Sequence, residues 1–127
     1  MNDTFVTRRI AQSPDAIAPD GSEVRILASS TRGSMAHFRL PAGTVSKAVA
    51  HRTVEEIWYF VGGRGRMWRK LARTEEIVEV KPGVSISIPV GTHFQFRADG
   101  GGTLEAVGVT MPPWPGMDEA YEVKGVW

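Results

Sequence analysis

The sequence predicts an all-β protein, an antiparallel β-sandwich or barrel, from two observations. First, short segments rich in Val, Ile, Phe, Trp and Thr alternate apolar with polar residues, which is the pattern of a half-buried strand. Second, fourteen glycines and eight prolines interrupt the chain at short intervals, and no long stretch has the apolar period of a helix. Short strands that recur about every ten residues between turn signals are typical of sandwiches and barrels.

Seven segments show this alternation and are expected to form strands. They are residues 22–29, 34–41, 55–61, 76–83, 84–90, 94–98 and 103–111. Glycines and prolines at residues 41–43, 62–65, 81–83, 89–91 and 99–102 supply the backbone angles that tight reversals need. No helix longer than a turn or two is expected.

Length and composition limit the function classes. A chain of 127 residues forms one domain, which buries roughly two-thirds of its unfolded surface. A net charge of +1 gives no general field for nucleic acid or an anionic membrane, so neither is expected as a partner. The absence of cysteine excludes disulfides, thiolate nucleophiles and Cys-ligated zinc. Without a signal-peptide pattern or a segment of membrane-spanning length, the expected location is the cytoplasm.

Residues 64–83 are expected to form a charged hairpin. Its first strand carries Arg64, Arg66, Arg69 and Lys70, and its second carries Glu75, Glu76 and Glu79. Basic residues interleaved with Trp68 are one sign of a nucleic-acid surface. The acidic partner strand instead favours ion pairs across a solvated hairpin, each contributing about 0.2–1 kcal/mol.

The chain divides into an arm, a barrel and a tail. Residues 1–23 have no strand pattern and are expected to form an N-terminal loop or arm, and residues 24–111 to form the barrel. Prolines in residues 112–127 enforce an extended start to a tail that packs on the barrel, as an edge strand or across its mouth. Trp114 and Trp127 are expected to cap a pocket or to lie at a dimer interface.

Two motifs in register carry a family resemblance. The first places Gly43, then Val49 and His51, then Glu55 or Glu56, then Gly62 or Gly63; the second places Gly83, Pro89, Gly91, Phe94 and Ala98. With these motifs the chain resembles the small single-domain cupins, the RmlC-like jelly rolls of the cupin type-2 family. The resemblance spans roughly residues 24 to 110 and implies a cupin jelly-roll barrel. It also implies a homodimer.

The resemblance implies a metal site that this chain has partly lost. Metal-binding cupins use two His and one Glu from the first motif and a third His from the second, a set that suits Mn, Fe, Ni, Zn or Cu. Here Val49 and Phe94 stand at two of the His positions, and Ala98 replaces an Asn. His51 and one glutamate remain, and two protein ligands hold a first-row metal weakly.

Which glutamate faces the barrel interior depends on the spacer after His51. A longer spacer selects Glu56 and a shorter one Glu55, and strand alternation allows only one of them to point inward; the alignment favours Glu56. Two other histidines are candidate replacement ligands. His93 lies one residue from the third His position and needs a β-bulge to point inward, while His37 lies on the strand of residues 34–41.

Three functions are compatible with this pattern. Val49, Trp58, Phe60, Phe94 and Phe96 predict a largely apolar pocket for a small molecule, in which His51 and Glu56 serve as a metal-free general acid and base. The second function is a metal-dependent enzyme of the dioxygenase, isomerase or decarboxylase type with a non-standard ligand set. The third is a non-catalytic dimeric barrel. The two lost ligands favour the first function.

Overall fold

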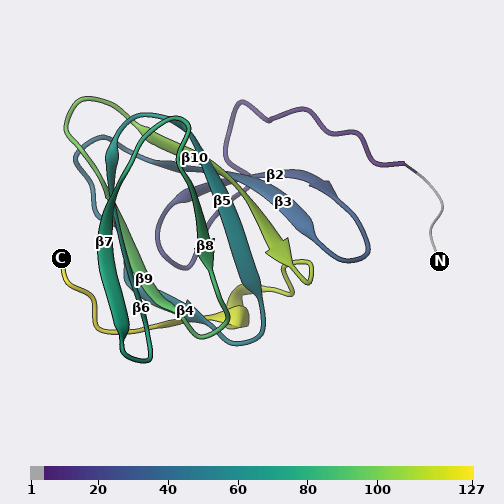
Figure 1. Ribbon diagram of the computed structural model, residues 1–127. Coiled ribbons are helices and arrows are strands. Elements are labelled where there is room, and N and C mark those ends of the chain that lie inside the picture. The colour runs from purple at the N-terminus through teal and green to yellow at the C-terminus, as the bar shows by residue number, and fades with distance from the viewer. Residues whose placement is uncertain (1–4) are drawn as a thin grey trace.

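The computed structural model describes residues 5–127, which form two antiparallel sheets packed face to face (Figure 1). The six strands of the first sheet, in spatial order, are β1 (Ala16–Ile17), β2 (Glu23–Ser29), β3 (Ser34–Leu40), β10 (Leu104–Met111), β5 (Glu55–Gly62) and β8 (Ser85–Ile88). The five strands of the second are β11 (Ala120–Glu122), β4 (Val49–His51), β9 (His93–Ala98), β6 (Gly65–Leu71) and β7 (Thr74–Val80). The predicted all-β class is confirmed.

Helical structure is minimal. Within residues 5–127 the helical structure is one 3₁₀ turn, η1 (Met117–Glu119), and this part of the chain contains no helix long and apolar enough to cross a membrane. The seven alternating segments overlap strands of the structure. β1 and β4 are too short to produce an alternation, and the sequence pattern missed them.

The alternation works as expected on β5 and β10. Residues of β5 are exposed and buried in turn, and those of β10 do the same, because successive side chains point to opposite faces of a strand. Gly43, Gly83 and Gly91 have φ of 73°, 97° and 80°. These angles suit glycine at the predicted turns, because a Cβ disfavours them.

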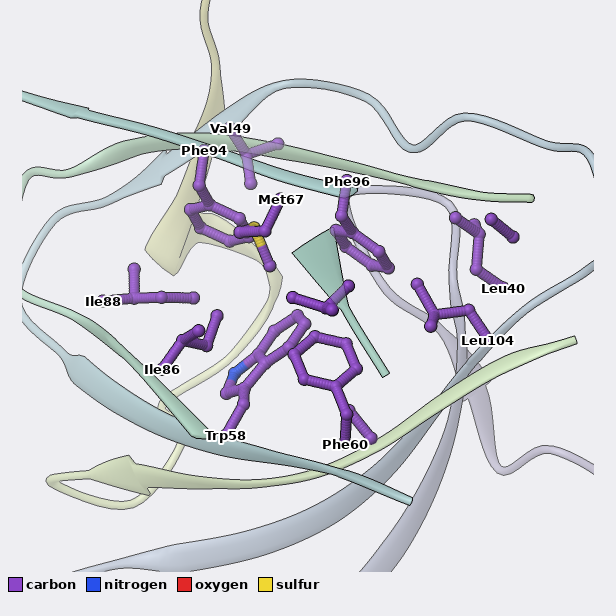
Figure 2. Packing of buried hydrophobic residues seen from close by; sticks show 13 residues of the cluster. Leu40, Val49, Trp58, Phe60, Met67, Ile86, Ile88, Phe94, Phe96 and Leu104 are labelled. Atoms are coloured by element: carbon purple, nitrogen blue, oxygen red, sulfur yellow. The ribbon is translucent and has the colours of Figure 1, made fainter. Parts of the chain in front are cut away.

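The hydrophobic core lies between the two sheets (Figure 2). Its most deeply buried large side chains include Phe60, Met67, Ile88, Phe94 and Leu104. Trp58 connects this core to one end of the sandwich, with ring centroids 5.3 Å from Phe96, 6.0 Å from Phe94 and 6.1 Å from Phe60.

The predicted charged hairpin consists of β6 and β7, which pair from Gly65↔Val80 to Leu71↔Thr74. Arg64 lies 3.4 Å from Glu79 across the hairpin, and Arg69 pairs with Glu76. The predicted cross-strand ion pairs are therefore present.

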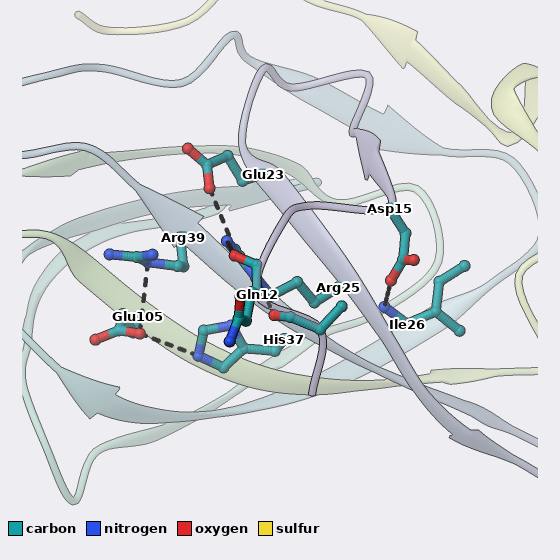
Figure 3. A network of polar contacts seen from close by, with 9 residues as sticks. Gln12, Asp15, Glu23, Arg25, Ile26, His37, Arg39 and Glu105 are labelled. Atoms are coloured by element: carbon teal, nitrogen blue, oxygen red, sulfur yellow. Dashed lines mark hydrogen bonds and ion pairs between the residues drawn. The ribbon is translucent and has the colours of Figure 1, made fainter. Parts of the chain in front are cut away.

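The N-terminal arm is tied to the outer side of the first sheet by Arg25 (Figure 3). This buried guanidinium on β2 donates hydrogen bonds of 2.9 Å to the carbonyl oxygens of Ala11 and Gln12. The arm then forms β1, and the loop that follows buries Asp20 and Ser22.

The C-terminal tail closes one end of the second sheet. β11 pairs antiparallel with β4, so the tail adds an edge strand, one of the two placements expected from the sequence. The carboxylate of Glu119 accepts bonds from Thr53 N at 2.6 Å, Thr53 Oγ1 at 2.6 Å and Val54 N at 2.9 Å. These contacts fix the tail to the β4–β5 loop.

Candidate functional site

A cavity of about 350 Å³ opens between the two sheets at the end where the tail crosses. Its wall combines inward residues of β3, β4 and β5 with the β1–β2 loop and the tail. The wall is mostly apolar, and its aromatic members are Phe38, Trp58, Phe94 and Trp114. This volume lies at the lower end of the range for small-molecule pockets, about 300–1,000 Å³.

His51 and Glu56 form a buried pair in this wall. Nδ1 of His51 lies 2.9 Å from Oε2 of Glu56, and both side chains are about 5% exposed or less. Nδ1 has no hydrogen-bond partner in this geometry. The contact is therefore a close approach of a ring nitrogen to a carboxyl oxygen.

Trp58 fixes the other carboxylate oxygen. Its indole N–H donates a 2.9 Å hydrogen bond to Oε1 of Glu56. Both residues lie on the inward face of β5, two positions apart. Because Trp58 is itself packed against Phe38 at 4.8 Å between centroids, it holds the carboxylate toward His51.

The backbone explains why this pair meets. β4 contributes His51 at its last residue, and β5 contributes Glu56 at its second residue. The three-residue connection between them is anchored by Glu119 through Thr53 and Val54. The two strands lie in different sheets, so the pair spans the gap between the sheets in the cavity wall.

Asp20 adds a second carboxyl to the cavity wall. It lies in the β1–β2 loop, 6% exposed, where Oδ1 accepts bonds from Ser22 N at 2.9 Å and Ser22 Oγ at 2.6 Å. Burial raises the pKa of Asp20 above 3.8; the Ser22 hydrogen bonds and His51 oppose this, and Glu56 adds to it. Asp20 therefore belongs to the same electrostatic group as the His51–Glu56 pair.

Trp114 covers His51 from the tail. The two ring centroids lie 5.2 Å apart in an edge-to-face arrangement, and Trp114 N donates a 2.9 Å bond to Ser34 Oγ on β3. Of the two placements expected for Trp114, this is the pocket cap. Trp127 instead lies on the far side of the second sheet, under the guanidinium of Arg97 at 4.8 Å.

The structure separates the predicted site residues into two groups. Val49, Trp58 and Phe94 line the cavity with His51 and Glu56. Glu55 is exposed at the start of β5, whereas Glu56 points inward. Phe60 and Phe96 were predicted to bind ligand, but they lie in the core behind Trp58 and do not line the cavity. This corrects their assignment, because packed core side chains fill the interior there.

Neither His37 nor His93 reaches the cavity, and both suggested ligand roles are corrected. His37 points to the outer side of β3, where Nε2 lies 3.2 Å from Oε1 of Glu105 (Figure 3). Burial, together with Arg25 and Arg39, lowers the pKa of His37 below 6.5 against the opposing effect of Glu105. β9 pairs with β6 without a register shift from His93 to Ala98, so the bulge needed to turn His93 inward does not occur.

The donor set does not fit a first-row metal. His51 and Glu56 are two ligands, and stable sites normally use three or four. Glu56 uses one oxygen to accept the Trp58 hydrogen bond, and Val49 and Phe94 place apolar groups in the remaining directions. In residues 5–127 no group of three His, Asp or Glu side chains is arranged to hold a metal.

Sequence reasoning missed Asp20, Phe38 and Thr110 in the cavity wall. Phe38 and Thr110 follow from strand phase, because they alternate with outward residues of β3 and β10. Asp20 has no such signal. It lies in a loop, where alternation makes no prediction, next to the turn residue Gly21 with φ of 93°.

Comparison with known proteins supplies the family and the fold. No family model matches the chain. Uncharacterized protein MJ1618 of Methanocaldococcus jannaschii is 32% identical over 107 residues, which cover 80% of this chain and 82% of that protein.

Solved structures match the fold at low identity. Oxalate decarboxylase from Bacillus subtilis, which has Mn(II) centres, superposes with a TM-score of 0.72 at 17% identity over 88% of this chain; the chain spans only 30% of that enzyme. CapF gives a TM-score of 0.69 at 17% identity, covering 98% of this chain and 37% of CapF. BH2720 of Bacillus halodurans gives 0.64 at 19% identity, covering 85% of this chain and 80% of that chain. These neighbours share the cupin jelly roll, so the fold expected from the motifs is confirmed. The chain belongs to the same family as protein MJ1618, and its fold is that of the cupins.

Proposed function

We propose that the protein binds a small, largely apolar molecule in the cavity and that His51 and Glu56 move a proton on it without a metal. One observation carries the proposal: a buried imidazole and a buried carboxylate lie 2.9 Å apart in the wall of an otherwise apolar cavity. The fold similarity to CapF, solved with the inhibitor 3-isopropenyl-tropolone, supports a small organic ligand.

The chemistry follows from the two side chains. Trp58 holds the carboxyl of Glu56 in place, and the imidazole of His51 lies 2.9 Å from it. An imidazole and a carboxyl within reach of the same bound molecule are the groups that general acid and base catalysis uses. The apolar wall excludes water, which strengthens each charge interaction with the bound molecule.

A ligand screen followed by hydrogen exchange tests the proposal. Thermal-shift hits from a library of small metabolites are incubated with the protein in D₂O, and loss of C–H signals is followed by NMR. We expect exchange at one position of a hit with the wild type and at least about a hundredfold slower exchange with Glu56→Gln. Glu55→Gln, one residue away but exposed, is the matched control and should exchange as the wild type does.

The metal-dependent alternative rests on the Mn(II) centres of oxalate decarboxylase. Metal analysis of untagged protein, dialysed against Mn, Fe, Ni or Zn, separates the two functions. About one ion per chain, lost in His51→Ala, would replace the metal-free proposal with this alternative.

A further inference from the structure

The charges in the cavity wall favour one sign of ligand. Asp20, His51 and Glu56 are the titratable side chains in the wall, and no Lys or Arg among the described residues lines it. An anion entering the cavity meets two carboxyls and a single group that can become positive. The same two carboxyls attract a cation, so the wall favours a cation over carboxylates and phosphates.

Asp20 is informative because its burial is costly. Moving a carboxyl from water into an apolar site costs several kcal/mol unless it is paired, and the hydrogen bonds it accepts among residues 5–127 both fall on Oδ1, from Ser22. An asparagine would accept both of these bonds without a charge. The loop structure alone therefore does not account for an ionisable group at this position.

The aromatic rings of the wall also favour a cation. Phe38, Trp58, Phe94 and Trp114 line the cavity, and ring faces attract cations by about 0.5–2 kcal/mol, more when water is excluded. A cation between these rings gains from their quadrupoles and from the two carboxyls together. Neither feature helps an anion.

On the basis of the function proposed above, we propose that the ligand is a small organic cation: an aryl- or alkylamine whose ammonium group lies against Asp20 and Glu56. Its apolar body lies among the aromatic rings. A cavity of about 350 Å³ holds on the order of ten non-hydrogen atoms at ordinary packing density.

The protonation of Asp20 adds a measurable consequence. Burial raises its pKa, and the nearby Glu56 carboxylate contributes in the same direction while His51 opposes it. An ammonium group beside Asp20 favours the ionised carboxyl, so amine binding releases protons wherever Asp20 was protonated beforehand. Calorimetry in two buffers of different ionisation enthalpy detects this release.

Three probes of matched shape test the ligand class. Affinities of 2-phenylethylamine, 2-phenylethanol and phenylacetate are measured by titration calorimetry on the wild type, on Asp20→Asn and on Asp118→Asn. Asp118 is exposed and does not line the cavity, so its variant controls for the loss of one negative charge. We expect the amine to bind about tenfold more tightly than the alcohol, with phenylacetate weakest.

The variants and the ranking separate the outcomes. The amine advantage should disappear in Asp20→Asn, persist in Asp118→Asn, and leave alcohol binding unchanged in both. Equal or tighter binding of the alcohol or phenylacetate to the wild type overturns the amine inference and leaves the proposed ligand site standing. No binding by any probe overturns the amine inference as well; the proposed function falls only if the metabolite screen also yields no cavity ligand. The ranking on the wild type needs no variant, so a misfolded Asp20→Asn protein does not prevent the decision.

Discussion

The indole N–H of Trp58 donates a 2.9 Å hydrogen bond to Glu56, its neighbour two positions earlier on the inward face of β5. This bond leaves the other carboxylate oxygen to face His51 at 2.9 Å. The proton-transfer pair is thus positioned by an aromatic residue that belongs both to the core and to the cavity wall.

Trp58→Phe should destabilise the fold by about 1–3 kcal/mol beyond the lost packing, because it leaves a buried carboxylate oxygen without a donor. Urea unfolding measures the change. Trp68→Phe is the matched control: its indole donates to Glu75 at 2.8 Å, but Glu75 is exposed and turns to water when the bond is lost. A loss in Trp58→Phe no greater than in Trp68→Phe would mean that Glu56 does not depend on the indole.

Glu119→Gln should remove a pH-dependent contribution to the stability of the fold. Burial opposes ionisation of Glu119, but the hydrogen bonds from Thr53 and Val54 outweigh it and lower its pKa below 4.5. The ionised group therefore stabilises the fold fully above pH 4.5, and this contribution is lost as the pH falls through the lower folded pKa.

The free energy of unfolding of the wild type should exceed that of Glu119→Gln by about 1–3 kcal/mol at pH 7. This difference should shrink as the pH falls below 4.5. Thermal unfolding across this pH range measures the gap. The exposed Glu122→Gln should lose less than about 0.5 kcal/mol at every pH. A constant gap for Glu119→Gln would contradict the assigned charge.

Val49→His combined with Phe94→His should create a metal site. These residues face each other across β4 and β9, and Val49 lies two positions before His51 on the same strand. Two added imidazoles with His51 and Glu56 complete a four-ligand set, so the folded double variant should bind about one Zn or Ni ion per chain. Titration calorimetry measures this, and adding His51→Ala should weaken it. A folded double variant that binds no metal would show that these four positions do not converge.

Phe60→Leu and Phe38→Leu should affect different properties. Phe60 is fully buried in the core, so its truncation should cost about 1–2 kcal/mol of stability without changing ligand affinity. Phe38 lines the cavity, so its truncation should weaken binding of a cavity ligand. Unfolding and binding measurements on both variants check this. A loss of affinity in Phe60→Leu would show that Phe60 contributes to the ligand site.

Strand alternation predicted the part of the site that depends on local phase. It placed Trp58 beside Glu56 and allowed only one glutamate to face inward. The spacing alone left Glu55 and Glu56 open, because the connection after His51 is irregular and is held by Glu119, from a distant part of the chain.

The remaining residues depend on contacts that the sequence does not encode locally. Asp20 reaches the cavity from a loop, and Trp114 from the tail. His37 follows the alternation of its strand, but alternation alone does not say which face is the outer one. Pairing of β3 with β10 places His37 on the outer side. Phe60 differs from Trp58 only in depth along β5, which alternation does not report.

The homodimer expected from the resemblance stays a prediction. Ile57, Tyr59 and Val61 form an exposed apolar row on the outward face of β5. Light scattering coupled to gel filtration measures the mass in solution, and a monomer at every concentration tested would contradict the expectation.

Ligand binding to a cavity-filled variant tests whether the cavity is the ligand site. Ala36 lies in the cavity wall on β3, so Ala36→Phe fills the space, while Ala28→Phe on β2 adds the same group at an exposed position. The affinity of the tightest ligand from the screen is measured on the wild type and on both variants after their folding is checked by circular dichroism. We expect loss of binding in Ala36→Phe and unchanged binding in Ala28→Phe. Wild-type affinity in folded Ala36→Phe would contradict it, because the ligand would then bind elsewhere.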